Sequence, residues 1–177
     1  FHRENFDRFE LILANDAAQS VFGPNMSRES IGEIGYLFDL LKVDFSGFTG
    51  VRFLDSQGFI HFSTFAADVQ SSAGLVKEYK RFASEESDFQ LDEILVVEGD
   101  TEVVLISAAD GNFIYKLPAL GTDDPLGGTA LFYVSSMSLS VDLIKSNVLD
   151  VGGKYTLIDG AGLLLKYQSG ILLEFES

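Results

Sequence analysis

Carboxylate side chains are the groups in this sequence that could most readily bind a metal ion. The chain of 177 residues has 27 Asp and Glu against 12 Lys and Arg, which gives a net charge of −15. Ca²⁺ takes about six to eight oxygen ligands. Three clusters concentrate carboxylates: Glu85, Glu86 and Asp88; Glu98, Asp100 and Glu102; Asp123 and Asp124. None has the alternating Asp-x-Asp-x-Asp-Gly spacing of a calcium loop, so we interpret them as solvated turns and expect no metal site.

Side chains suited to catalysis form no recognisable motif. Cys is absent, and the two histidines are His2 and His61, which leaves little room for thiolate chemistry or a nucleophile–His pair. Gly-x-Ser-x-Gly and both main phosphate-binding glycine motifs are missing. The serine-rich stretch 135–138 is typical of a strand end and a helix cap, and His61 alternates with apolar strand residues, which favours a surface position. We therefore expect neither catalysis nor a cofactor.

Length and charge limit the classes of protein. With 46% hydrophobic residues, the chain could form one compact domain, or one domain and part of another. The strong negative charge argues against nucleic acid and anionic lipid as partners, because both would be repelled. The sequence has no apolar run of about 18 residues and no signal-peptide pattern. It begins with Phe1, so we expect it to be a piece of a longer protein.

The central sequence feature is a hairpin signal over residues 51–64. Two β-rich runs, 51–54 and 59–62, flank the segment from Asp55 to Gly58. An Asp side chain can bond backbone two residues further on, and Gly supplies the positive φ of a tight turn. The same pattern returns at residues 157–164.

Helices are predicted before this hairpin. Residues 1–22 are amphipathic, and Gly23–Pro24 should end the helix. A second helix should begin near Ser30, with Glu33 as a possible capping-box partner. The apolar stripes comprise Phe6, Phe9, Leu13 and Ala17 in the first helix and Ile31, Ile34, Phe38 and Leu41 in the second.

After the hairpin, periodicity predicts mostly strands. A polar stretch at 66–72 and a short helix at 74–85 should come first. Turn signals at 99–100 and 110–111 favour an antiparallel meander of the strands that they separate. These three strands are expected at 93–98, 102–108 and 112–117. A fourth strand is expected at 129–137, a helix at 138–148, and closing hairpins over 154–165 and 171–175. This order predicts an α+β domain with one antiparallel sheet and helices packed on it.

The N-terminal helix, the hairpin at 51–64 and the strand-to-helix exit at 130–139 together resemble an extracytoplasmic Cache sensor domain. That family is PAS-like in fold and lies between two membrane helices of bacterial receptors. The resemblance implies an N-terminal helical region at 1–45 and a central-sheet sensor module at 46–150. Residues 151–177 then either begin a truncated second module, which we favour, or complete the first. It also implies a periplasmic or extracellular location within a membrane-bound signalling protein.

In a PAS-like module the ligand pocket lies between the sheet and the segment after the first hairpin, here 66–85. The resemblance therefore implies a small-molecule ligand held by five residues: Arg81, Tyr79, Lys116, Tyr115 and Tyr133. A guanidinium can bind a carboxylate through two hydrogen bonds, so Arg81, beside Lys80, is the leading candidate. The competing interpretation is that the cations lie on a solvated helix face and the tyrosines in the core. No Trp is present, so the family's amino-acid motif is not matched.

The resemblance also implies a homodimer through the N-terminal helix, with Phe6, Phe9 and Leu13 at the contact. A ligand could then shift the population between two sheet–helix geometries. The alternative function is a ligandless structural or dimerisation module with the same fold. A buried polar pocket would favour the sensor, and its absence the structural module.

Overall fold

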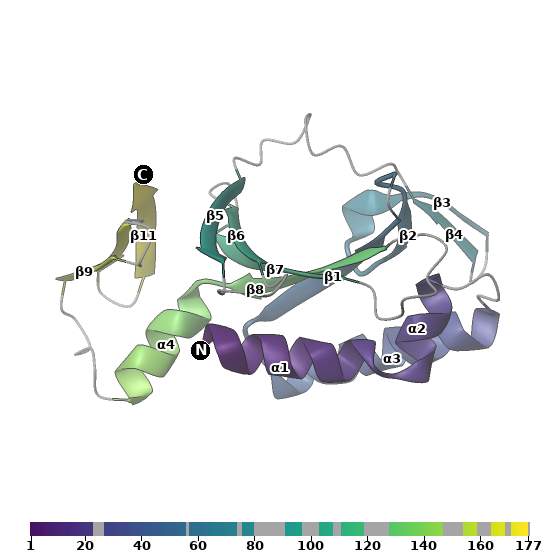
Figure 1. Cartoon of the computed structure of the whole chain (residues 1–177), viewed down its shortest axis with the longest axis horizontal. Helices are drawn as coiled ribbons and strands as arrows, with labels where there is room; N and C mark the ends of the chain where they lie inside the picture. Colours follow the sequence, from purple (N-terminus) through teal and green to yellow (C-terminus); the bar gives the residue numbers. More distant parts are fainter. Residues whose placement is uncertain are drawn as a thin grey trace.

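The computed structural model describes residues 1–22, 27–55, 57–73, 76–79, 91–96, 103–107, 111–118, 128–146, 154–158, 164–168 and 171–176. Its elements combine helices with antiparallel strands, which confirms the α+β class. Figure 1 shows a curved sheet with helices along one face and a second small sheet near the C-terminus.

The main sheet has six strands in the order β2-β1-β8-β7-β6-β5. One of its strand pairs joins segments far apart in the sequence, because β1 (Phe48–Leu54) pairs with β8 (Thr129–Ser135). The other strands are β2 (Ile60–Ser63) and β5 (Leu91–Val96) at the two edges, with β6 (Val103–Ser107) and β7 (Asn112–Pro118) inside the sheet. All neighbours are antiparallel. The meander predicted from the turn signals is therefore present as β5-β6-β7.

Helices α1 (His2–Leu13), α2 (Asp16–Phe22) and α3 (Arg28–Asp44) lie along one face of this sheet (Figure 1). Their apolar stripes bury aromatic rings against the strands: Phe9 stacks on Phe132 with ring centroids 4.2 Å apart. Phe38 contacts the rings of Phe48 and Phe62 in the same way. Stacked and edge-to-face aromatic pairs add about 0.5–1.5 kcal/mol each beyond their area burial. This aromatic layer fixes the helices on the sheet.

The opposite face of the sheet carries a second, smaller apolar cluster of Leu54, Ile60, Ile114, Leu131 and Tyr133. We call this side the second face. The chain that follows β2 runs through a 3-10 helix, η1 (Ala66–Asp68), into the hairpin of β3 (Val69–Ala73) and β4 (Val76–Tyr79). Figure 1 shows this hairpin beside β2.

Beyond β8 the chain forms α4 (Met137–Lys145) and a three-stranded antiparallel sheet. Its strands are β9 (Lys154–Ile158), β10 (Leu164–Gln168) and β11 (Ile171–Glu176). These strands agree with the predicted closing hairpins. They form a sheet separate from the six-stranded one.

The predicted hairpin is present, and Asp55 organises its turn. The Asp55 carboxylate accepts backbone N–H bonds from Gln57 at 2.8 Å and Phe59 at 2.9 Å, and Gly58 has φ = 80°. His61 lies with Nε2 3.1 Å from the same carboxylate. Burial alone would raise the pKa of Asp55, but the bonds from Phe59, His61 and Gln57 outweigh it and lower that pKa.

We expect Asp55→Ala to lower the free energy of unfolding by about 1–2 kcal/mol, since two backbone donors lose their acceptor. A carboxylate with a lowered pKa stabilises the fold above its unfolded pKa and ceases to do so as the pH falls through its folded pKa. The difference between wild type and variant should therefore shrink under acid in urea titrations. Asp39→Ala, at an exposed site on α3, is the control, and an equal effect of both variants would contradict this role.

One local prediction was wrong, and three predicted helices are present but differ in detail. The helix predicted at 74–85 is replaced in the described part by strand β4, since Val69 to Ala73 pairs with it as a hairpin. The first helix is interrupted after Leu13, where α1 ends and α2 begins at Asp16. The second helix is capped by Ser27, whose hydroxyl accepts from the Ser30 N–H, rather than by Ser30. The last helix is α4, 137–145, which ends before the predicted 148.

Candidate functional site

Arg52 is a buried charged residue on the second face of the sheet. In β1 the side chains alternate, so Val51 and Phe53 join the aromatic core under the helices while Arg52 points the other way. Only 8% of Arg52 is exposed. A buried guanidinium requires partners for its charge and its donors, and the elements after β2 supply them.

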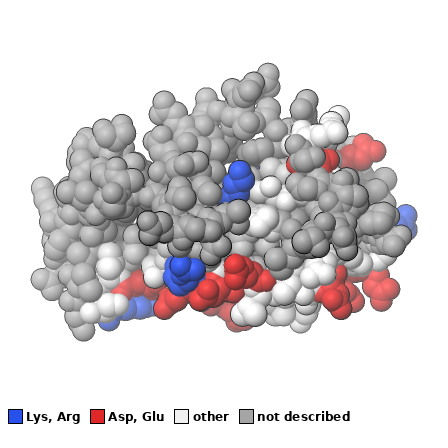
Figure 2. Space-filling model, viewed as in Figure 1, with Lys and Arg blue, Asp and Glu red and all other residues white. Residues whose placement is uncertain are grey.

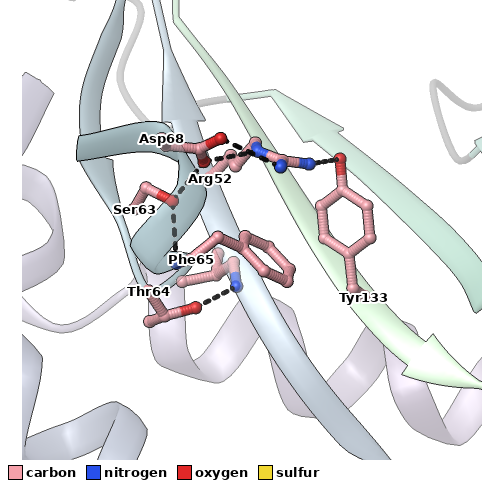
Figure 3. Close-up of polar contacts among 7 residues, drawn as sticks. Arg52, Ser63, Thr64, Phe65, Asp68 and Tyr133 are labelled. Carbon is pink, nitrogen blue, oxygen red and sulfur yellow. Dashed lines mark hydrogen bonds and ion pairs between the residues drawn. The ribbon is translucent and has the colours of Figure 1, made fainter. Parts of the chain in front are cut away.

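Asp68 and Tyr133 hold the guanidinium of Arg52 (Figure 3). Nε donates to Asp68 Oδ2 at 2.7 Å and Nη2 to Asp68 Oδ1 at 3.1 Å, so the pair has the two-bond, fork-like geometry. Nη1 donates to the Tyr133 hydroxyl at 2.6 Å. Burial by itself would lower the pKa of Arg52, but the hydrogen bond and charge of Asp68, together with Tyr133, outweigh it and raise that pKa.

Ser63 and Phe65 complete this network between the end of β2 and η1. The Ser63 hydroxyl donates to Asp68 Oδ2 at 2.5 Å and accepts the Phe65 N–H at 3.0 Å. The Phe65 ring lies under the guanidinium, with Arg52 Cζ 4.3 Å from its centroid. A Cβ on Gly50 would meet Phe65 Cζ at 2.5 Å, so the missing side chain lets this ring lie against β1. The network ties η1 to the sheet.

Lys116 lies on the same face, two strands away from Arg52. Both Arg52 on β1 and Lys116 on β7 pair in register with Leu131 of β8, so the three side chains form one row across the sheet. Because neighbouring strands lie about 4.8 Å apart, the backbones of Arg52 and Lys116 are about 10 Å apart. Lys116 is exposed, and it forms no ion pair with any residue that the structure describes.

Tyr79, at the end of β4, is half-buried against the apolar cluster of this face. Burial is the main cause that raises the pKa of its phenol, with a backbone bond at Ser63 acting in the opposite direction. The phenol is therefore neutral at physiological pH and can act as a hydrogen-bond donor or acceptor. The face thus combines an apolar floor, one paired cation, one cation that has no ion-pair partner among the described residues, and tyrosine hydroxyls.

Comparison with known proteins assigns the whole chain to one family. The family model TP_0593_N, described as an N-terminal domain, matches residues 1–177. The chain belongs to the TP_0593_N family. It is also 31% identical over 144 residues to an uncharacterized protein of Treponema pallidum (strain Nichols), a match that covers 81% of this chain and 21% of the relative. The chain thus spans about a fifth of the length of that relative.

The structure of this TP_0593_N domain brings together three of the five predicted ligand residues. Tyr79, Lys116 and Tyr133 all lie on the second face. Tyr115 does not: it points into the helix-side core, where its hydroxyl accepts from Asn5 Nδ2 at 2.9 Å, and burial raises its pKa. The assignment of Tyr115 to a pocket wall is therefore corrected to a core role. Arg81 and Lys80 lie outside the described residues.

The residues assigned to a dimer contact are instead part of the core of the TP_0593_N domain. Phe6 and Phe9 are 0% exposed and Leu13 is 2% exposed, because they pack against the sheet of their own chain. A contact of α1 with another copy would have to use its opposite face, which carries Leu11 at 76% exposure. The dimer itself stays a prediction.

Other expectations concern metals and membranes. Within the described ranges no group of three or more metal-ligating side chains occurs, and the three acidic clusters lie outside those ranges. Nor does any helix among the residues that the structure describes have the length and apolar character to cross a membrane. Carboxylates gather along the lower edge of Figure 2, over the helical layer of the TP_0593_N domain. The exposed carboxylates of helices α1 to α3 are Glu4, Asp7, Glu10, Asp16, Glu29, Glu33, Asp39 and Asp44.

Sequence reasoning missed Arg52 and Asp68. Arg52 stands between Val51 and Phe53 in an otherwise apolar strand, and a charge inside an apolar strand signals a buried partner. That partner could not be chosen, because Asp68 lies 16 positions later in a segment interpreted only as a polar stretch.

Proposed function

We propose that this domain is a ligand-sensing module that binds a small carboxylate on the second face of its sheet. The observation that carries the proposal is the row of Arg52, Leu131 and Lys116, in which one cation is paired inside the chain and the other is exposed without an ion-pair partner among described residues. Pockets for small molecules are mostly apolar with a few convergent polar groups. This face has that composition, which suits the binding of a ligand rather than catalysis.

The segment after β2 is the element that such a ligand would affect. It is tied to the sheet through Asp68, whose carboxylate binds Arg52 and Ser63. A ligand carboxylate at Lys116 adds a negative charge on the second face, and the backbones of Lys116 and Arg52 are about 10 Å apart. If it binds one position of the η1–β4 segment more tightly than another, it shifts the population between them by its differential affinity.

The setting we propose is the extracytoplasmic part of a membrane-bound signalling protein, as the resemblance to Cache domains implies. An antiparallel sheet with an N-terminal helix on one face, and with the segment after the first hairpin on the other side, is consistent with a PAS-like module. The relative's greater length leaves room for output regions outside this domain.

A thermal-shift screen tests the proposal. Among amino acids, organic acids, purines, polyamines and divalent cations, we expect organic acids to raise the melting temperature, because a ligand specific to the folded state stabilises it by mass action. Lys116→Ala should reduce the apparent affinity of the best acid about tenfold. Lys42→Ala removes another exposed lysine, on α3, and should leave the apparent affinity unchanged. A response that survives Lys116→Ala would contradict the assigned site.

The alternative is a ligandless structural or dimerisation module, and one observation favours it. Arg52 already has Asp68 and Tyr133 as partners within the chain, which is how a purely structural anchor behaves. A flat screen across all five compound classes would select this alternative.

A further inference from the structure

An open groove lies at the end of the sheet where β1 begins and β8 ends. It is about 420 Å³ in volume and is lined by the N-terminal half of α1, by residues 44–47 and by α4. Figure 1 shows α4 beside the N-terminal end of α1. The Ser135 N–H donates to Gly47 O at 2.8 Å, and a Cβ on Gly47 would meet Ser138 Cβ at 2.7 Å. The missing side chain of Gly47 thus lets α4 lie against the α3–β1 turn.

Charged side chains of both signs line the groove without pairing with one another. The cations are Arg8 and Lys145, and the anions are Glu4, Asp44 and Asp142. None of the five forms an ion pair with another described residue. A cation and an anion that line one groove without pairing can bind the negative group and the positive group of one ligand.

One of these charges is held in position by a ring. The Arg8 guanidinium lies 4.3 Å from the centroid of Phe45, a cation–π contact that restricts the arginine at the groove wall. The groove also has apolar walls: Met137 is 47% exposed and Val141 is 44% exposed along α4. Its lining therefore offers a fixed cation, carboxylates and an apolar surface.

We propose that this groove is a second binding site, and that its ligand is a zwitterion with an apolar side chain: a free amino acid or a dipeptide. The carboxylate of the ligand binds Arg8, its ammonium group binds the carboxylate of Asp142, and its side chain contacts Met137 and Val141. The volume lies within the range of about 300–1,000 Å³ that is typical of small-molecule sites. The site is independent of the carboxylate site on the second face.

Such a ligand would connect the first helix to α4. Arg8 belongs to α1 and Asp142 to α4, so binding both charges of one molecule restrains the two helices relative to each other. Because every charged group in the groove is solvent-exposed, each contact is weak, and we expect dissociation constants on the order of 1 mM.

The test uses L-leucine and glycyl-L-leucine as probes, with binding measured by NMR titration of the backbone amides. Leucinamide lacks the carboxylate and N-acetyl-L-leucine lacks the ammonium group, and each should bind at least tenfold more weakly than leucine. Arg8→Gln should weaken leucine about fivefold without altering leucinamide, and Asp142→Asn should weaken leucine without altering N-acetyl-L-leucine. Matched controls are Arg28→Gln and Asp39→Asn, at exposed sites of α3 outside the groove.

Saturable shifts of amides in α4 and at residues 44–47, with this charge selectivity, would support the zwitterion site. No saturable shift with either probe would overturn it. Equal binding of leucine and N-acetyl-L-leucine would also overturn it, since the groove would then recognise only an anion. Loss of binding in the control variants would assign the effect to overall charge rather than to this groove.

Discussion

Arg52→Met is expected to lower the free energy of unfolding by about 3–5 kcal/mol in urea titrations. The substitution keeps an apolar stem but leaves the Asp68 carboxylate, 12% exposed, without its cation. Adding Asp68→Asn should restore part of this loss, because the uncompensated buried charge is then removed. The double variant should therefore be more stable than Arg52→Met alone, a non-additivity that a double-mutant cycle measures directly.

Lys116→Met is the matched control for Arg52→Met. It removes a cation from the same row of the sheet, but Lys116 is exposed and has no ion pair with a described residue, so its effect should stay within about 0.5 kcal/mol. Similar stabilities for the Arg52 and Lys116 variants would mean that the Arg52–Asp68 pair does not hold η1 on the sheet.

Phe9→Ala is expected to cost about 3–5 kcal/mol of folding free energy. The Phe9 side chain is fully buried and, among the described residues, contacts the rings of Phe132, Tyr115 and Phe48. Truncation leaves a cavity that these rings can fill only in part. Chemical denaturation followed by circular dichroism measures the loss.

Leu11→Ala, on the exposed face of the same helix, is the control for Phe9. At 76% exposure it should change the stability by no more than about 0.5 kcal/mol. If Phe9→Ala instead left the stability intact and reduced self-association in sedimentation experiments, the ring would belong to a contact between copies, and its burial within one chain would be contradicted.

The sequence allowed local structure to be predicted where one short segment carries the whole signal. The turn of the first hairpin follows from Asp55 and Gly58 alone, and the structure has both the side-chain bonds and the positive φ. Helical periodicity likewise identified Phe6 and Phe9 as one apolar stripe, but periodicity cannot say whether a stripe meets its own sheet or another molecule. The described core shows that it meets the sheet.

Pairing between strands and between distant elements explains the remaining differences. Residues 74–85 carry apolar side chains at spacings that suit a helix. Their described part, 76–79, is nevertheless a strand, because pairing with the neighbouring β3 outweighs a short periodic signal. Tyr115 and Lys116 are adjacent in the sequence and fall on opposite faces once β7 pairs with β8. The partnership of Arg52 with Asp68 and Tyr133 joins three separate elements, so composition alone could not reveal it.

The measurement that most directly tests the sensing proposal is a methyl NMR titration with the organic acids of the thermal-shift screen. Ile114 and Leu131 report on the second face, whereas Val51 and Val134 lie in the core on the helix side. We predict saturable shifts of the Ile114 and Leu131 methyl groups that are lost in Lys116→Ala, with Val51 and Val134 unchanged. If no acid shifts Ile114 or Leu131, the second face does not bind a carboxylate and the sensing proposal is contradicted.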